Sequence, residues 1–270
     1  MKASGEIRNE FRYFRADNLC RSFGGVRAVN NFSAELDKGE IVGLIGPNGA
    51  GKTTVFNLIT GMDVTDSGTI YFDRNYITGR PAHAIARSGI ARTFQNIRLI
   101  EDLSVLDNIK IAYHCHIKYN ILHAAFRLPN FFAAERQISD RSMEFLRLFG
   151  MENLANEPAG SLPYGKRRKL EIARALATEA TLILLDEPAA GMNDGETLEL
   201  SGLIRQIRDD FKVTIFLIEH DMNFVMNLCE RIIVLNFGEI IACGPPEQIK
   251  RDPAVVDAYL GVERAGPGEK

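Results

Sequence analysis

Long apolar runs are missing from this sequence. None approaches the roughly 18 residues that a membrane-spanning helix needs, and the stretches around 181–185 and 232–235 end within a few residues. The polar residues 1–8 also lack the apolar segment of a secretory signal. We therefore expect a chain that cannot cross a bilayer alone and that resides in the cytoplasm.

The sequence also has few cysteines, a small net charge and no linker-like stretch. The four cysteines form no Cys-x-x-Cys pair, which favours reduced thiols over a disulfide framework. A formal net charge of −3 provides no global positive field, so we expect no nucleic-acid partner. Without repeats or a Pro/Gly/Ser-rich linker, 270 residues of which 46% are hydrophobic predict one compact body with a sizeable core.

The sequence does contain a regular alternation of strand-like and helical patterns. We expect several strands within 11–45, the last at 41–45, then an edge strand within 66–73 and further strands at 182–185, 213–218 and 231–235. We expect helices after Thr54, over 135–149 and 196–210, and from Met222; helical patterns dominate 104–174, with an apolar interruption at 130–132. Near-continuous apolar strands that alternate with helices indicate an α/β protein whose parallel sheet is covered on both faces.

Residues 46–53 match the pattern G-x-x-x-x-G-K-S/T between an apolar strand and a helix. In this context glycines let backbone N–H groups surround a phosphate, and the helix directs its positive end at the same anion. We expect Lys52 to meet the β- and γ-phosphates and the Thr53 hydroxyl to suit Mg²⁺. A glycine-rich turn with a surface lysine is the weaker interpretation, because all four fixed positions agree. The predicted phosphate cradle comprises Gly46, Pro47, Asn48, Gly49, Ala50, Gly51, Lys52, Thr53 and Thr54.

Two carboxylates, Asp186 and Glu187, follow the apolar strand expected at 182–185. At the carboxyl end of a parallel strand they would face the crevice in which such sheets bind ligands. Asp186 is expected to hold Mg²⁺, and Glu187 to polarise the attacking water. On its own an Asp-Glu pair after a strand is more often a solvated turn, but the cradle favours the functional interpretation.

Five segments occur in the order and approximate spacing of the ATP-binding-cassette (ABC) ATPases, a family that the sequence resembles from about residue 16 to 260. They are GPNGAGKTT at 46–54, TFQN at 93–96, SLPYGKRRKLEIARAL at 161–176, LILLDEP at 182–188 and IEHD at 218–221. Five ordered motifs are hard to obtain by chance. Within the family the chain looks most like the ATPase subunits of bacterial branched-chain amino-acid importers, on residues 90–99, 170–176, 187–193 and 257–261.

The resemblance implies an α/β fold of the P-loop NTPase (RecA-like) type, with a parallel-sheet core, an antiparallel β subdomain and an inserted helical subdomain. One ABC ATPase domain would span 14–262. Within it, 14–94 and 177–250 would form the nucleotide-binding core with the β subdomain, and 95–176 would form the helical subdomain. Residues 263–270 are expected to be a flexible tail.

Taken position by position, the resemblance implies roles for residues outside the cradle as well. Phe23 would stack on adenine, with a core phenylalanine as the alternative. Gln95 would reach Mg²⁺ and the attacking water, and His220 would hydrogen-bond the γ-phosphate. The implied catalytic residues are Glu187, His220, Gln95 and Lys52, and the implied Mg²⁺ ligands are Thr53, Gln95 and Asp186.

The signature segment, residues 162–166, departs from the LSGGQ pattern of the family. Family members use it in trans, where it opens a helix whose N-terminus caps the γ-phosphate held by another subunit. Here the segment consists of Leu162, Pro163, Tyr164, Gly165 and Lys166. Pro163 lacks a serine's hydroxyl, and Lys166 replaces a neutral amide with a cation, whereas Gly165 and the helix dipole are retained. The replacements bear on hydrolysis at the completed site more than on nucleotide binding.

Two other clusters, one basic and one rich in histidine, are interpreted without a functional role. The basic run 166–169 is typical of a solvated helix face, an interpretation that we prefer for Arg168 and Lys169. A group of histidines superficially suggests a metal site, but no carboxylate or second cysteine lies at ligand spacing, so we expect no metal there. This group consists of His114, Cys115, His116 and His123.

The resemblance also implies partners. Two subunits, forming a homodimer or a heterodimer with a second ABC ATPase, would clamp two ATP molecules with Mg²⁺ between one chain's cradle and the other's signature segment. Their closure and opening would be transmitted to transmembrane permease subunits through a groove near Gln95 and the helical lobe, and indirectly to a periplasmic solute-binding protein. The chain would then be a peripheral protein on the cytoplasmic face of the inner membrane.

Three other functions stay open on the sequence. The ATPase of a lipid or lipopolysaccharide exporter is similar, and an ATPase subunit does not contact the cargo. A weakly hydrolytic, nucleotide-gated partner subunit would follow from Pro163 and Lys166. A cassette ATPase of translation or DNA repair is less favoured, because such chains usually carry two cassettes or a long coiled-coil insertion.

Overall fold

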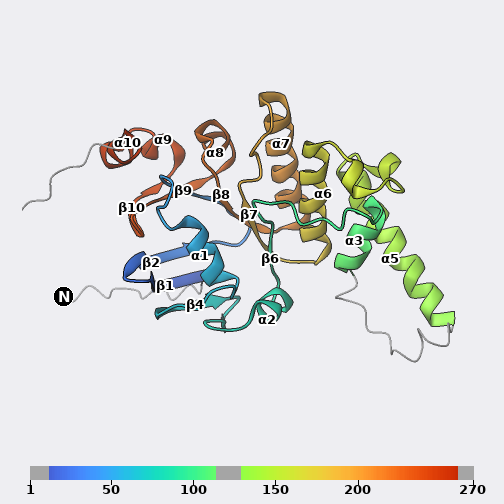
Figure 1. Ribbon diagram of the computed structural model, residues 1–270, viewed down its shortest axis with the longest axis horizontal. Coiled ribbons are helices and arrows are strands. Elements are labelled where there is room, and N and C mark those ends of the chain that lie inside the picture. The colour runs from blue at the N-terminus through green and yellow to red at the C-terminus, as the bar shows by residue number, and fades with distance from the viewer. Residues whose placement is uncertain (1–11, 114–128, 261–270) are drawn as a thin grey trace, which may run out of the picture.

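The computed structural model describes residues 12–113 and 129–260, except for the side chains of 129–133 and 260 (Figure 1). This part of the chain forms a four-stranded sheet, a six-stranded sheet and a set of helices. The tail expected at 263–270 and the group His114, Cys115, His116 and His123 lie outside the described residues. No helix in the described ranges combines the length and the apolar character that a membrane crossing requires.

The smaller sheet is antiparallel, with the strand order β2-β1-β4-β5. Its strands are β1 (Phe14–Phe23), β2 (Val26–Leu36), β4 (Ser67–Phe72) and β5 (Asn75–Tyr76). The predicted edge position of the strand within 66–73 was wrong, because β4 lies between β1 and β5. Asp73 and Arg74 both have positive φ, at 44° and 65°, and so return the chain in a tight hairpin that adds the two-residue β5.

The larger sheet has the strand order β10-β9-β3-β8-β7-β6, and its strands are parallel except for β10. They are β3 (Ile41–Ile45), β6 (Ile90–Arg92), β7 (Leu182–Asp186), β8 (Thr214–Ile218), β9 (Arg231–Asn236) and β10 (Glu239–Gly244). Every residue of β3, β7 and β8 is buried, which confirms the sheet predicted from their apolar runs. The patterns did not predict β6, which has only three residues, or the half-exposed β10.

Alternation along the central strands divides the core into two clusters. Val42 and Leu44 face the smaller sheet and share a cluster with Phe56, whereas Ile41 and Ile45 face the opposite side. Helix α1 (Lys52–Ile59) contributes to the first cluster and lies between the two sheets. Helices α6 (Tyr164–Ala177), α7 (Asp194–Phe211) and α8 (Met222–Leu228) contribute to the second. The expectation that helices cover both faces of the sheet is thus confirmed.

The remaining helices lie at the periphery. Helix α3 (Val105–Tyr113) and helix α5 (Pro129–Leu148) pack with α6 on one side of the larger sheet (Figure 1). The others are α2 (Ala82–Arg87), α9 (Pro246–Ile249) and α10 (Pro253–Leu260), with 3₁₀ turns at Glu152–Leu154 and Ala159–Ser161. The predicted interruption at 130–132 was wrong, because α5 runs through it; Pro129 stands at the first helical position, where its missing N–H costs nothing.

Candidate functional site

The phosphate cradle joins the end of β3 to α1, and two of its glycines are required by the backbone packed against them. Gly46 has φ 151°, and a Cβ there would lie 1.9 Å from the carbonyl oxygen of Leu235. Gly51 has φ 102°, and a Cβ there would lie 2.2 Å from the carbonyl oxygen of Ala28. Any larger residue at either position would displace a neighbouring strand. The loop is therefore packed tightly against β9 and β2, whereas Asn48 and Gly49 are exposed to solvent.

Lys52 folds back over this loop. Its Nζ donates to the carbonyl oxygens of Gly46 at 2.7 Å and Pro47 at 2.9 Å. Burial lowers the pKa of Lys52, while the negative charges of Glu187 and Asp186 raise it. The lysine therefore lies within electrostatic reach of both carboxylates, and the cradle and the end of β7 form one site. The neighbouring Thr53 is exposed at the first turn of α1.

Asp186 ends β7 as predicted, and it is paired with an arginine that the sequence analysis did not assign to the site. Arg92 donates to Asp186 Oδ2 at 2.8 Å, and each side chain is only 6% exposed. Arg92 also donates to Asn57 Oδ1 at 2.7 Å, and its guanidinium lies over the ring of Phe94. The carboxylate thus has a fixed direction, because its cation is itself fixed by a residue of α1.

Gln95 and His220, two residues with predicted catalytic roles, both lie close to the side chain of Glu187. Gln95 Nε2 donates to Glu187 Oε2 at 3.0 Å, and His220 Nδ1 lies 3.9 Å from the same oxygen. Glu187 has φ 49°, an unusual conformation for a residue with a side chain, and its N–H donates to the carbonyl of Ile218 at 2.9 Å. Strained backbone at a residue that faces a charged cluster is common at functional sites.

A second carboxylate, Glu219, supports this cluster and was missed by the sequence analysis. It is fully buried, and it accepts hydrogen bonds from the N–H groups of Ala189 at 2.8 Å and His220 at 3.1 Å. Burial raises the pKa of Glu219, and these backbone donors partly oppose the shift. Glu219 therefore fixes the backbone of His220 relative to the segment that follows Glu187.

Phe23 lies at the end of β1 and is 45% exposed, so the alternative of a core phenylalanine was wrong. The guanidinium of Arg21 lies 4.7 Å from the centre of its ring. Asp63 and Asp66 both pair with Arg21, at 2.7 and 2.9 Å. One face of the ring thus rests on an anchored cation, and the ring remains open to a stacking ligand.

The signature segment opens α6 as predicted. Pro163 is the N-cap residue of this helix, and no side chain caps it. Leu162 is buried, whereas Tyr164 is 44% exposed. No hydrogen bond or ion pair within the described residues joins 162–166 to the cradle of the same chain.

The solvated-face interpretation of Arg168 and Lys169 was wrong. Arg168 is fully buried and Lys169 is 7% exposed. Arg168 is surrounded by acceptors from another segment of the chain, and Lys169 donates to Glu199 of α7 at 2.5 Å. On folding, both cations therefore replace water with hydrogen-bond acceptors of the protein.

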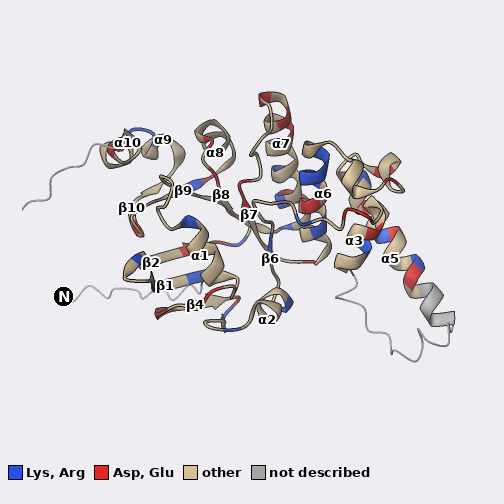
Figure 2. Cartoon of the chain, in the orientation of Figure 1, with Lys and Arg blue, Asp and Glu red and all other residues tan. Residues whose placement is uncertain are grey.

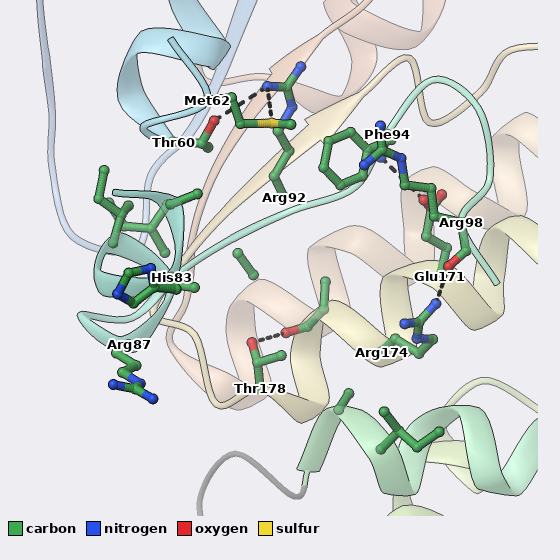
Figure 3. Close-up of a pocket in the computed structure, with 18 residues that line it drawn as sticks. Thr60, Met62, His83, Arg87, Arg92, Phe94, Arg98, Glu171, Arg174 and Thr178 are labelled. Atoms are coloured by element: carbon green, nitrogen blue, oxygen red, sulfur yellow. Dashed lines mark hydrogen bonds between the residues drawn. The ribbon is translucent and has the colours of Figure 1, made fainter. Parts of the chain in front are cut away.

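A cavity of about 650 Å³ lies beside this network, between β6 and helices α2, α3 and α6 (Figure 3). Its lining is mostly apolar but includes four arginines: Arg87, Arg92, Arg98 and Arg174. Figure 3 shows Arg98 against the ring of Phe94, at 3.9 Å from the ring centre, with Glu171 beside them. Arg92 and Phe94 also line the cavity. Part of its lining therefore comes from side chains that hold Asp186 and the segment preceding Gln95.

Comparison with known proteins is consistent with this geometry. A family model described as "ABC transporter" matches residues 29–190, and one described as "Branched-chain amino acid ATP-binding cassette transporter" matches residues 239–265. The high-affinity branched-chain amino acid transport ATP-binding protein BraF of Pseudomonas aeruginosa is 44% identical over 90% of this chain and 95% of its own length. LivG of Escherichia coli, described in the same terms, is 45% identical over 91% and 96%.

More distant relatives share the fold. The lipopolysaccharide export system ATP-binding protein LptB of Escherichia coli is 37% identical over 91% of this chain and 96% of its own. Among solved structures, the ADP conformation of MJ1267, an ATP-binding cassette of an ABC transporter, has a TM-score of 0.81 at 30% identity, covering 92% of this chain and 98% of that one. The predicted α/β fold of the P-loop type is confirmed.

Proposed function

Because this chain belongs to the ABC transporter ATPases, we propose that it powers the import of branched-chain amino acids, or of a similar small solute, through separate membrane subunits. Like its family, the chain binds ATP and hydrolyses it in a reaction coupled to transport. The cargo assignment is supported by the match at residues 239–265 and by the higher identity to BraF and LivG than to LptB.

The observation that carries the site assignment is the convergence of Gln95 and His220 on Glu187, beside the cradle. In our proposal the cradle residues 46–54 hold the phosphates of ATP, and Phe23 stacks on the adenine. Lys52 exchanges its bonds to Gly46 and Pro47 for phosphate oxygens. Glu187 orients and polarises the water that attacks the γ-phosphate, and His220 hydrogen-bonds that phosphate.

The residues around Asp186 fit a magnesium ion. Mg²⁺ prefers oxygen donors, and Thr53, Gln95 and Asp186 supply a hydroxyl, an amide and a carboxylate. The ion pair with Arg92 uses Oδ2 of Asp186 and so holds that oxygen in place. When bound, the metal would neutralise charge that develops on the phosphate oxygens. Arg92 orients Asp186, and Glu187 orients Gln95.

We further propose that a second ABC ATPase subunit, in a homodimer or heterodimer, completes the site. Its residues Leu162, Pro163, Tyr164, Gly165 and Lys166 would meet the nucleotide in trans, with the N-terminus of α6 directed at the γ-phosphate. The domain boundaries stay those expected above, with one ABC ATPase domain over 14–262 and a helical subdomain over 95–176.

Transmembrane permease subunits would dock in the cavity between β6, α2, α3 and α6, which has the apolar lining and the convergent charges of a binding groove. The chain would thereby be a peripheral protein on the cytoplasmic face of the inner membrane, linked indirectly to a periplasmic solute-binding protein. Arg92 supports this placement, because it lines the cavity and also pairs with Asp186.

The substitution Glu187→Gln tests the hydrolytic assignment in the transporter assembled with its membrane subunits. ATP binding should be retained, because the cradle is untouched, while turnover falls at least about 100-fold. Glu152→Gln is the matched control, since Glu152 is exposed on the 3₁₀ turn at Glu152–Leu154 and should change neither quantity. Unchanged turnover in Glu187→Gln would contradict the role of this carboxylate.

A weakly hydrolytic partner subunit is the second candidate, favoured specifically by the uncapped Pro163 at the start of α6. It predicts that ATP turnover of the assembled transporter resides in the other ATPase and survives Glu187→Gln. Turnover that is lost in the same variant favours the first candidate.

A further inference from the structure

Arg168 lies one turn into α6, among the basic residues that Figure 2 shows along this helix. Its guanidinium donates to the carbonyl oxygens of Phe94 at 2.7 Å and Gln95 at 2.9 Å. It also donates to Glu171 Oε2 at 2.8 Å and to the hydroxyl of Tyr164 at 3.0 Å. One buried side chain therefore joins the signature segment to the backbone of Gln95.

Glu171 completes the connection from the next turn of the helix. Its Oε1 accepts the N–H of Phe94 at 3.2 Å, so both polar groups of the Phe94 backbone are bound by α6. Burial raises the pKa of Glu171, while the Phe94 N–H and Arg168 oppose the shift. We call Arg168 and Glu171 the clamp.

A buried ion pair is an expensive way to stabilise a helix, since apolar residues of similar volume often do as well or better. It does fix geometry, because a planar guanidinium satisfies several acceptors at set angles. A lysine at 168 would offer one compact ammonium group to four separated acceptors. The geometry that the clamp imposes on its acceptors is therefore a better guide to its role than the stability that it contributes.

Each end of the clamp leads to a different half of the site. On one side, Gln95 reaches Glu187 at 3.0 Å. On the other, Tyr164 belongs to the signature segment, and its ring lies about 3.4 Å from where a Cβ on Gly191 would be. A shift of the first turn of α6 must therefore either move the backbone of Gln95 or break hydrogen bonds of a buried, charged side chain.

We propose that Arg168, supported by Glu171, is a positioning residue that locks Gln95 to the signature helix. The chain's own hydrolytic site and the surface that it offers to a second subunit then move as one body. This inference rests on the proposed roles of Gln95 and of residues 162–166. It adds a connection in cis between two segments that act on different ATP molecules.

A double-mutant cycle of Arg168→Lys with Gln95→Ala, in the full chain assembled with its membrane subunits, tests the proposal. Arg168→Lys should lower kcat by about 10- to 100-fold, the effect of a small misplacement of a catalytic group, and leave the Kd for MgATP unchanged. In the Gln95→Ala background the same substitution should have almost no further effect, because Arg168 acts through Gln95.

Arg167→Lys is the matched control on the neighbouring position. Arg167 pairs with the exposed Glu101, and within the described residues its side chain makes no hydrogen bond to the Gln95 backbone, so the kcat of Arg167→Lys should remain that of the wild type. Should Arg168→Lys fail to fold, Glu171→Gln takes its place in the cycle, since it keeps the acceptor shape and weakens the clamp.

Additive effects in the cycle, or an unchanged kcat in Arg168→Lys, would overturn the clamp while leaving the proposed function intact. An unchanged kcat in Gln95→Ala alone would overturn the proposed role of Gln95, and the clamp with it. A loss of MgATP affinity in place of kcat would overturn the clamp by showing that Arg168 supports the nucleotide pocket in general.

Discussion

The cradle and the first turns of α6 hold their cations in opposite ways. Lys52 donates to carbonyls only 6 and 5 residues away, within its own loop. Arg168 donates to carbonyls 74 and 73 residues away, in the loop that follows β6. A locally tethered cation can exchange its partners for a ligand without disturbing the fold, whereas a cation that joins distant segments cannot. The first arrangement suits binding, and the second suits transmission.

The substitution Lys52→Met should have the largest effect on activity. Turnover should fall by about 100- to 1,000-fold, because the positive charge at the phosphates is lost. The free energy of unfolding should stay the same or rise, since burial lowers the pKa of Lys52 and so disfavours its charged form. ATPase assays measure the turnover, and urea unfolding of the same preparation measures the free energy of unfolding. A strongly destabilised Lys52→Met would contradict the difference drawn between Lys52 and Arg168.

The substitution Arg168→Met should have the largest effect on stability. It leaves Glu171 and two backbone carbonyls without their cation in a buried place, which should lower the free energy of unfolding by about 3–5 kcal/mol. Urea unfolding measures the loss. A change below about 1 kcal/mol would mean that water or a neighbouring side chain replaces the guanidinium, and that α6 is not tied to the Gln95 segment.

Glu219 should give a smaller effect that depends on pH. Its folded pKa is raised above the ordinary value of 4.5, so the folded chain holds this proton to higher pH than the unfolded chain. The contribution of Glu219 to stability is therefore present at low pH and falls as the pH rises from about 4.5 through the raised folded value. Unfolding free energies measured across this range should decline less steeply in Glu219→Gln, and parallel curves would contradict the prediction.

The substitution Glu199→Gln should have the smallest effect. Glu199 is 66% exposed, and although Lys169 holds the pKa of its carboxyl below the usual range, solvent screens the pair. The free energy of unfolding should change by less than about 1 kcal/mol. A loss comparable to that of Arg168→Met would show that the whole basic run, not Arg168 alone, ties α6 to its surroundings.

Local patterns predicted the parts of the site that are local. The cradle follows from glycine spacing between a strand and a helix, and Asp186 and Glu187 follow from an apolar run that ends in carboxylates. Arg92, Arg168 and Glu219 were missed because their partners are supplied by other elements: Asp186 from β7, the Phe94–Gln95 backbone, and Ala189. The edge strand was misplaced because β5 depends on a two-residue turn with positive φ.

Uptake of labelled leucine by proteoliposomes tests the central claim most directly. The vesicles would carry this chain, its membrane subunits and a solute-binding protein, with MgATP on the side of the ATPase. We predict ATP-dependent accumulation of leucine that is lost in Glu187→Gln and retained in Glu152→Gln. Leucine uptake that is independent of ATP, or equal in both variants, would contradict the account.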